Sequence, residues 1–125
     1  MKASLNSIYH QTGDWLRETD FYKLELSILQ KRLEEIAAKN TAQDVLAEVE
    51  HFQNKFILLK EELDILAHDL NKGETEVDNK IKQMPEHTNE KFVSMNGKMQ
   101  QRMKTFASGF ADLRFEFNSF LSKVM

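Results

Sequence analysis

The chain has 125 residues, with 17 Lys and Arg against 20 Asp and Glu, which gives a formal net charge of −3. This length suits one domain with a core of its own. Only four Gly and one Pro leave few places to turn, which argues against a β-sandwich, a barrel or a many-layered α/β fold. The absence of Cys excludes disulfides, thiolate zinc sites and cysteine catalysis.

The first segment has the apolar period of an α-helix. Its large apolar residues recur every seven positions at Trp15, Tyr22, Leu29 and Ile36. The same register extends back to Leu5, which predicts a helix over about residues 4–39. A later start at Asp14 competes with this one, because Asp14 is a good N-cap that follows Gly13. The longer helix is favoured.

A second helix is predicted over about residues 41–83. Asn40 can end the first helix in the left-handed conformation, and Thr41 can cap the next one. The apolar residues then alternate steps of four and three at Val45, Val49, Phe52, Phe56, Leu59, Leu63, Leu66 and Leu70. Gly73 could break this helix, but the apolar pattern keeps its phase on both sides, so continuation is expected.

A third helix is predicted over about residues 86–125, after the break at Met84-Pro85. One apolar row runs through Phe92, Met99, Phe106, Leu113 and Phe120, and its neighbour through Met103, Phe110, Phe117 and Val124. The fold class is therefore all-α: one domain over residues 1–125, built as an elongated antiparallel up-down-up three-helix bundle with coiled-coil-like heptad packing. Oligomerisation could complete such a bundle.

Some apolar residues are surplus to the stripe that each helix needs for its own core. If the first turn lies near residues 40–41, a residue of the first helix and a residue of the second lie at the same height when their numbers add to about 81. If the chain folds back at Pro85, the same holds for the second and third helices when the numbers add to about 171. Six surplus residues then converge on one band around the waist of the bundle: Phe21, Leu24, Ile28, Ile57, Leu58 and Phe115. They need not all share one face.

Three interpretations of these six residues stay open. A three-helix core needs more than two apolar positions per heptad, so part of the surplus can be core. The band can instead be a self-association surface, or a site for a different protein. An exposed apolar patch of that size would be unusual on a monomer. The leading hypothesis is a non-enzymatic bundle that acts through protein–protein contacts, as a homo-oligomer or with another protein.

No residue pattern points to catalysis or to a bound cofactor. Glu48 and His51 have the spacing found in di-metal carboxylate bundles, but a second such motif is missing and His51 should lie off the core. The Met and Phe residues of the third helix could form an adaptable interior pocket, although core filling explains them better, and a haem there would have only His87 nearby. The leading hypothesis therefore includes no metal or cofactor. The alternative function is a ligand- or metal-binding bundle that uses Glu48 and His51 or the Met and Phe interior of the third helix.

Charge is uneven along the chain. Residues 1–79 hold nine basic and sixteen acidic residues, whereas residues 80–125 hold eight and four. The densest basic group, Lys98, Arg102 and Lys104, lacks the interleaved aromatic residues of a nucleic-acid platform, so neither nucleic acid nor a membrane is expected as a partner. No continuous apolar stretch opens the sequence as in a secretory signal, and a soluble, cytoplasmic protein is expected.

Overall fold

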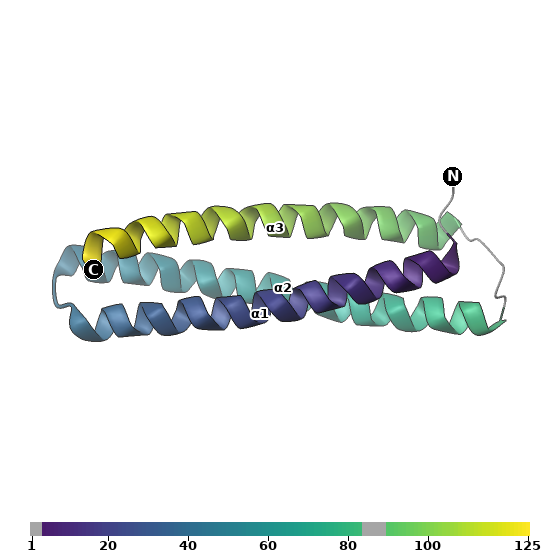
Figure 1. Cartoon of the computed structure of the whole chain (residues 1–125), viewed down its shortest axis with the longest axis horizontal. Coiled ribbons are helices and arrows are strands. Elements are labelled where there is room, and N and C mark those ends of the chain that lie inside the picture. The colour runs from purple at the N-terminus through teal and green to yellow at the C-terminus, as the bar shows by residue number, and fades with distance from the viewer. Residues whose placement is uncertain (1–3, 84–89) are drawn as a thin grey trace.

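The computed structural model describes residues 4–83 and 90–125, which form three long helices and no other regular element. The helices are α1 (Leu5–Lys39), α2 (Gln43–Gln83) and α3 (Glu90–Val124). They run side by side along one axis, with each helix antiparallel to the one before it (Figure 1). The predicted all-α, up-down-up three-helix bundle is confirmed.

α1 begins at the earlier of the two predicted starts. Ser4 is its N-cap, and the Ser4 hydroxyl accepts a hydrogen bond from the Ser7 backbone N–H at 3.1 Å. This bond satisfies one of the donors that an α-helix leaves free in its first turn. Asp14 lies well inside the helix.

The connection from α1 to α2 differs from its prediction. Asn40 has extended backbone (φ −122°) rather than the left-handed conformation, because its side-chain amide donates to the Ile36 carbonyl at 2.8 Å and so takes over the task of a left-handed cap. α2 begins at Gln43 rather than at residue 41, with the Leu46 N–H bonded to the Ala42 carbonyl. Thr41 therefore lies in the extended connection and does not cap α2.

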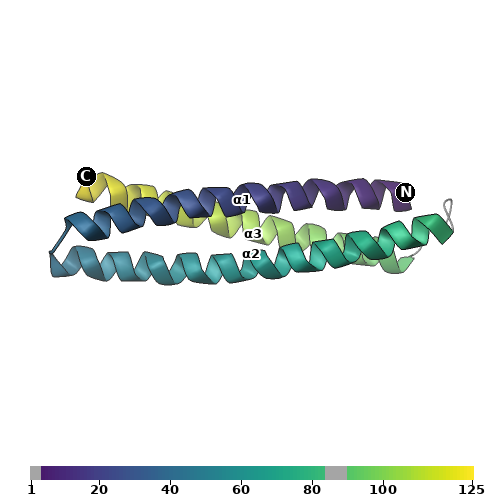
Figure 2. The same cartoon turned by 90° about the horizontal axis from the view of Figure 1, so that it is seen from below.

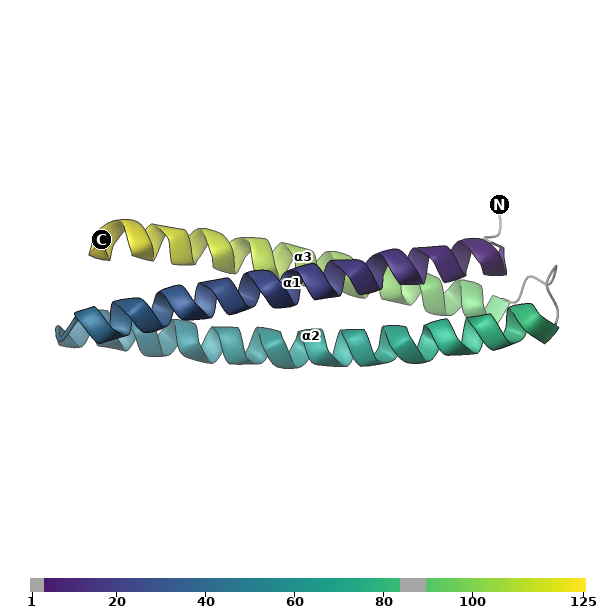
Figure 3. The ribbon, with the colours of Figure 1, turned by 60° about the horizontal axis from the view of Figure 1, so that its bottom comes forward.

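α2 is continuous through Gly73, as the apolar phase predicts. Its 41 residues span about 60 Å at 1.5 Å per residue. The predicted break at Met84-Pro85 and the first residues of the predicted third helix lie outside the described residues, and α3 is described from Glu90 onward. Figures 2 and 3 show the three axes staying close together from one end of the bundle to the other.

The core consists of a long cluster and a short one. The long cluster runs along all three helices and follows the predicted apolar rows, except that it also contains Leu121, which neither predicted row of the third helix included. The short cluster closes the end where the chain begins and contains Leu5, Ile8, Val77 and Phe92. Because α1 reaches back to Leu5, this end has apolar cover from all three helices.

Phenylalanine rings attach α3 to the other helices. The Tyr22 ring lies 5.1 Å from the ring of Phe106 and 5.0 Å from that of Phe110. Farther along, the Phe117 ring lies 5.3 Å from the rings of both Phe52 and Phe56. The backbones of α1 and α2 approach each other more closely than either approaches α3. α3 therefore lies farther from the other two helices, with aromatic rings filling the space between.

Candidate functional site

All six residues predicted for the waist band are exposed to solvent. Their exposed fractions lie between 51% for Ile28 and Ile57 and 75% for Phe115. The three-helix core is therefore complete without them, and the interpretation of the six as core is wrong. Full packing of a three-helix core leaves these apolar side chains in water.

An ion pair shows where the α1 residues of the band lie. Arg114 of α3 donates to both carboxylate oxygens of Glu25 at 3.3 Å, which marks the flank of α1 that faces α3. Phe21 precedes Glu25 by four residues and Ile28 follows it by three, so both lie on that same flank. Leu24 lies between them and points farther out.

Phe115 lies on the outer side of α3. It follows Arg114 by one residue, which places it about 100° further round the helix, and its neighbour Phe117 contacts Phe56 of α2. Phe21, Leu24 and Ile28 thus form an exposed apolar strip on the outer side of α1, and Phe115 is exposed on the outer side of α3. We call these four residues the α1/α3 patch.

The other two predicted residues lie on different faces. Ile57 borders a groove between α1 and α2 together with Gln30 and Glu34. Leu58 points away from that groove, toward the side of α3. The six residues therefore form a band around the waist but not one continuous surface.

Ile65 is an exposed apolar residue that the sequence analysis missed. It is 57% exposed and follows Leu58 by seven residues, so the two lie in one line along α2. It precedes Asp69 by four residues, and Asp69 accepts a hydrogen bond from Arg102 of α3 at 2.9 Å. The seven-residue spacing to Leu58 was the signal that could have identified it.

A groove runs between α2 and α3 beside Leu58 and Ile65. Its volume is about 450 Å³, and its floor contains Leu59, Leu66 and Phe106. Gly109 lines it without a side chain, and a Cβ there would meet open space. The groove exists because the aromatic rings between α3 and the other helices keep the backbone of α3 away from that of α2.

The predicted pairing of residues at equal height along the bundle is correct between α2 and α3 but not between α1 and α2. The Asp69–Arg102 bond joins two residues whose numbers add to 171, as predicted. Between α1 and α2, Lys23 lies 4.0 Å from Asp64, about one and a half turns beyond its predicted partner. The extended residues 40–42 carry the chain past the end of α1, which explains the shift.

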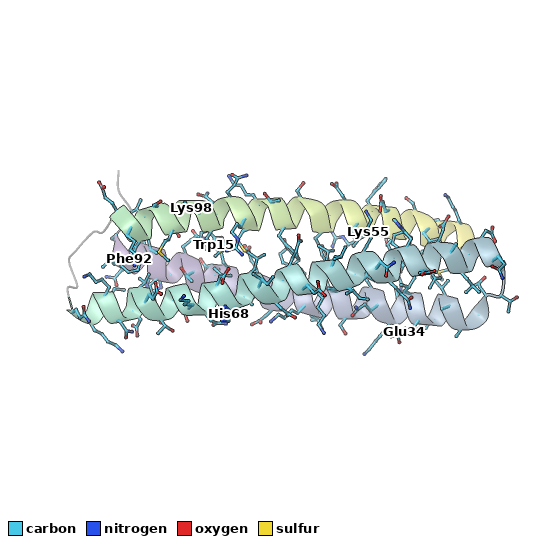
Figure 4. The ribbon with its side chains drawn as sticks, turned by 180° about the vertical axis from the view of Figure 1, so that it is seen from behind. Trp15, Glu34, Lys55, His68, Phe92 and Lys98 are labelled. Atoms are coloured by element: carbon cyan, nitrogen blue, oxygen red, sulfur yellow. The ribbon has the colours of Figure 1, made fainter. Side chains whose placement is uncertain are left out.

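Glu48 and His51 are not joined by a third potential metal ligand among the residues that the structure describes. Both are exposed on α2, and the His51 ring packs edge-on against Phe52. Within residues 4–83 and 90–125, no three potential ligands come close enough together to hold an ion. His68 lies on the outer face of α2 (Figure 4), and His87 lies outside the described residues.

The Met and Phe residues of α3 are mostly core. Met103, Phe92 and Phe106 are buried, and Met84 lies outside the described residues. A small cavity of about 50 Å³ lies beside Phe92 and Met99, with Trp15 pointing into the bundle there (Figure 4). That volume suits water rather than a haem or a lipid chain. The Oδ1 atom of Asn96, which lines the cavity, is buried without a hydrogen-bond partner.

Two pKa shifts in the described residues have causes in burial, neighbouring charges and hydrogen bonding. Burial raises the pKa of the Tyr22 phenol, and the nearby carboxylates of Glu18 and Glu25 raise it further. Arg102 belongs to the predicted basic group, and its bond to Asp69 lowers the pKa of that carboxyl. These shifts accompany packing and ion pairing, and neither creates an activated nucleophile or base.

No protein-family model, curated protein or solved structure matches the chain. None of the helices described is both long and apolar enough to cross a membrane.

Proposed function

We propose that this is a non-enzymatic helical-bundle protein that acts through protein–protein contacts and associates with itself. The observation that carries the proposal is the α1/α3 patch, whose four large apolar side chains are all more than half exposed. Together they expose roughly 450 Å², taking about 200 Å² for a phenylalanine and somewhat less for Leu and Ile. Apolar patches of several hundred Å² on soluble proteins are often functional.

The position of the patch supports an interface rather than a ligand site. Its side chains stand on the convex outer sides of two helices and enclose no cavity, whereas small-molecule sites are concave. A helix or a second bundle can cover such a surface along its length. The remaining waist residues, Ile57 and Leu58, would lie at the sides of such an assembly, outside its contact.

Replacing two residues of the patch tests the proposal. In Phe21→Ser/Leu24→Ser, we expect the oligomer to dissociate while far-UV circular dichroism keeps the helical signal, because neither side chain contributes to the core. Light scattering coupled to size exclusion measures the mass. The matched control is Ile57→Ser, which removes a side chain of similar exposure on the α1/α2 side and should leave the mass unchanged. An oligomer that survives the double replacement would overturn the proposal.

A second candidate is a different protein whose helix lies in the groove between α2 and α3. The observation in its favour is the apolar floor of that groove, with Leu58 and Ile65 exposed along its edge. An amphipathic helix is the usual occupant of such a groove. Leu58→Ser/Ile65→Ser should abolish binding of that partner and leave self-association through the α1/α3 patch intact.

A further inference from the structure

α1 carries a second heptad stripe on its outer side. Its residues alternate steps of four and three, as the buried stripe of the same helix does, and all six are exposed: Arg17, Phe21, Leu24, Ile28, Lys31 and Glu35. The middle of this outer stripe is apolar and both of its ends are charged. A stripe with this period is the surface that one helix presents to another along a shared seam.

We propose that the partner on the outer stripe is the α1 helix of a second copy, lying antiparallel with Leu24 of each copy opposite Ile28 of the other. This inference rests on the self-association proposed above and specifies its geometry. The twofold axis passes level with residue 26. Along the seam, Phe21 lies against the aliphatic stem of Lys31, and Arg17 faces Glu35.

Charge complementarity selects this arrangement. A parallel pair in register would place Arg17, Lys31 and Glu35 each against its own copy, which repels at three layers. Sliding the antiparallel pair by one heptad would set Arg17 against Ile28, or Glu35 against Leu24, and would lose both Arg17–Glu35 pairs. In the proposed register each basic end meets an acidic end, and the apolar centres coincide.

The flanks of the outer stripe add one favourable and two unfavourable pairs. On the side that faces α3, Glu18 comes within a turn of Arg32 of the second copy, while the two copies of Glu25, each paired with its own Arg114, are offset by only about 3 Å along the axis. On the opposite side, Asp20 comes near Glu34, and these exposed like charges weaken the dimer slightly.

The seam covers Phe21, Leu24 and Ile28 on both copies, which removes roughly 600 Å² of apolar surface from water. This is small against the total of about 1,200 Å² at which specific interfaces begin. We therefore expect a reversible dimer rather than a permanent one.

Engineered cysteines test the register, because the natural chain contains none. Ser27 is exposed beside the seam, and in the proposed dimer its two copies are offset by only about 3 Å along the axis. Ser27→Cys should therefore give a covalent dimer with a short bismaleimide. The matched control is Ala38→Cys, exposed in the same outer line of α1, whose two copies would be about 36 Å apart and should give almost none.

Charge reversal provides a second test. Arg17→Glu and Glu35→Arg should each weaken the dimer about tenfold, because each turns two attractions into repulsions. The double variant should recover wild-type affinity, and an equal mixture of the two single variants should form a mixed dimer. A parallel dimer in register would leave the self-association of each single variant unchanged and would cross-link through Ala38→Cys.

Failure of the register can be told apart from failure of the proposed function. If Phe21→Ser/Leu24→Ser dissociates the oligomer but Ser27→Cys gives no covalent dimer, the antiparallel register is wrong and the patch remains the contact. If the wild-type chain is monomeric at every concentration measured, both proposals are overturned. A covalent dimer through Ser27→Cys together with rescue by the double charge reversal establishes the register.

Discussion

Two phenylalanines of α3 allow a direct test of which side chains hold the bundle together. Phe117 is fully buried, and its ring lies 5.3 Å from the rings of Phe52 and Phe56. Phe115, two residues earlier on the same helix, is 75% exposed. Replacing each by Ala removes the same atoms from the same helix, so the difference between the two variants isolates the contribution of burial.

The expected costs differ by several kcal/mol. Phe117→Ala loses the transfer free energy of a buried ring and leaves a cavity among the other rings, which together cost about 3–5 kcal/mol. A domain of this size is stable by about 5–15 kcal/mol, so the variant loses a large share of its stability, and its Tm should fall by roughly 15 °C. Phe115→Ala should change the stability of the monomer by no more than about 0.5 kcal/mol.

Urea unfolding followed by far-UV circular dichroism measures both costs. The protein concentration must be low enough for the monomer to dominate, because self-association would otherwise add to the measured stability. A cost below about 1 kcal/mol for Phe117→Ala, or equal costs for the two variants, would refute the assignment of these residues to core and surface.

Three further predictions concern single residues in the half of the bundle that contains the N-terminus of α1. Arg102 lowers the pKa of Asp69 in the folded state, so this ion pair stabilises the fold above the unfolded Asp pKa of about 3.9, and that stability is lost as the pH falls through the lower folded pKa. Asp69→Asn should therefore reduce the loss of unfolding free energy on the acid side by less than about 1 kcal/mol. If urea unfolding at a series of pH values gives the same slope for the variant and the natural chain, the pair is contradicted. Asn96→Leu should raise the free energy of unfolding by about 1 kcal/mol, because it removes a buried oxygen without a partner and fills part of the neighbouring cavity; a lower urea midpoint would show that water satisfies the amide. Gly73→Ala should stabilise by about 0.5–1 kcal/mol, since the added methyl meets nothing within 4 Å inside a continuous helix; a loss in thermal melts would contradict that continuity.

Periodicity was sufficient to predict the helices. The phase of the apolar residues extended α1 back to Leu5 and carried α2 through Gly73, because the stripe that faces the core must stay in register along a helix. The connection was less predictable. Both a left-handed Asn40 and a bond from its side chain to Ile36 satisfy the end of a helix, and only three-dimensional packing selects between them.

The exposed band was predictable for the same reason as the core. A residue such as Leu24 or Phe115 that falls far from the core stripe of its helix has no place inside a three-helix bundle. Which faces these residues share depends on the rotation of each helix about its own axis and on its position along the axis of the bundle. The Glu25–Arg114 ion pair shows which flank of α1 faces α3, and no sequence spacing within a single helix contains that information.

The central claim is that the exposed outer side of α1 joins copies of this chain. The most direct test is the mass of the unmodified protein by sedimentation equilibrium over a wide range of concentration. We expect the mass to rise reversibly with concentration from the monomer mass of 14.6 kDa to twice that value. A mass of one chain at every concentration would contradict it.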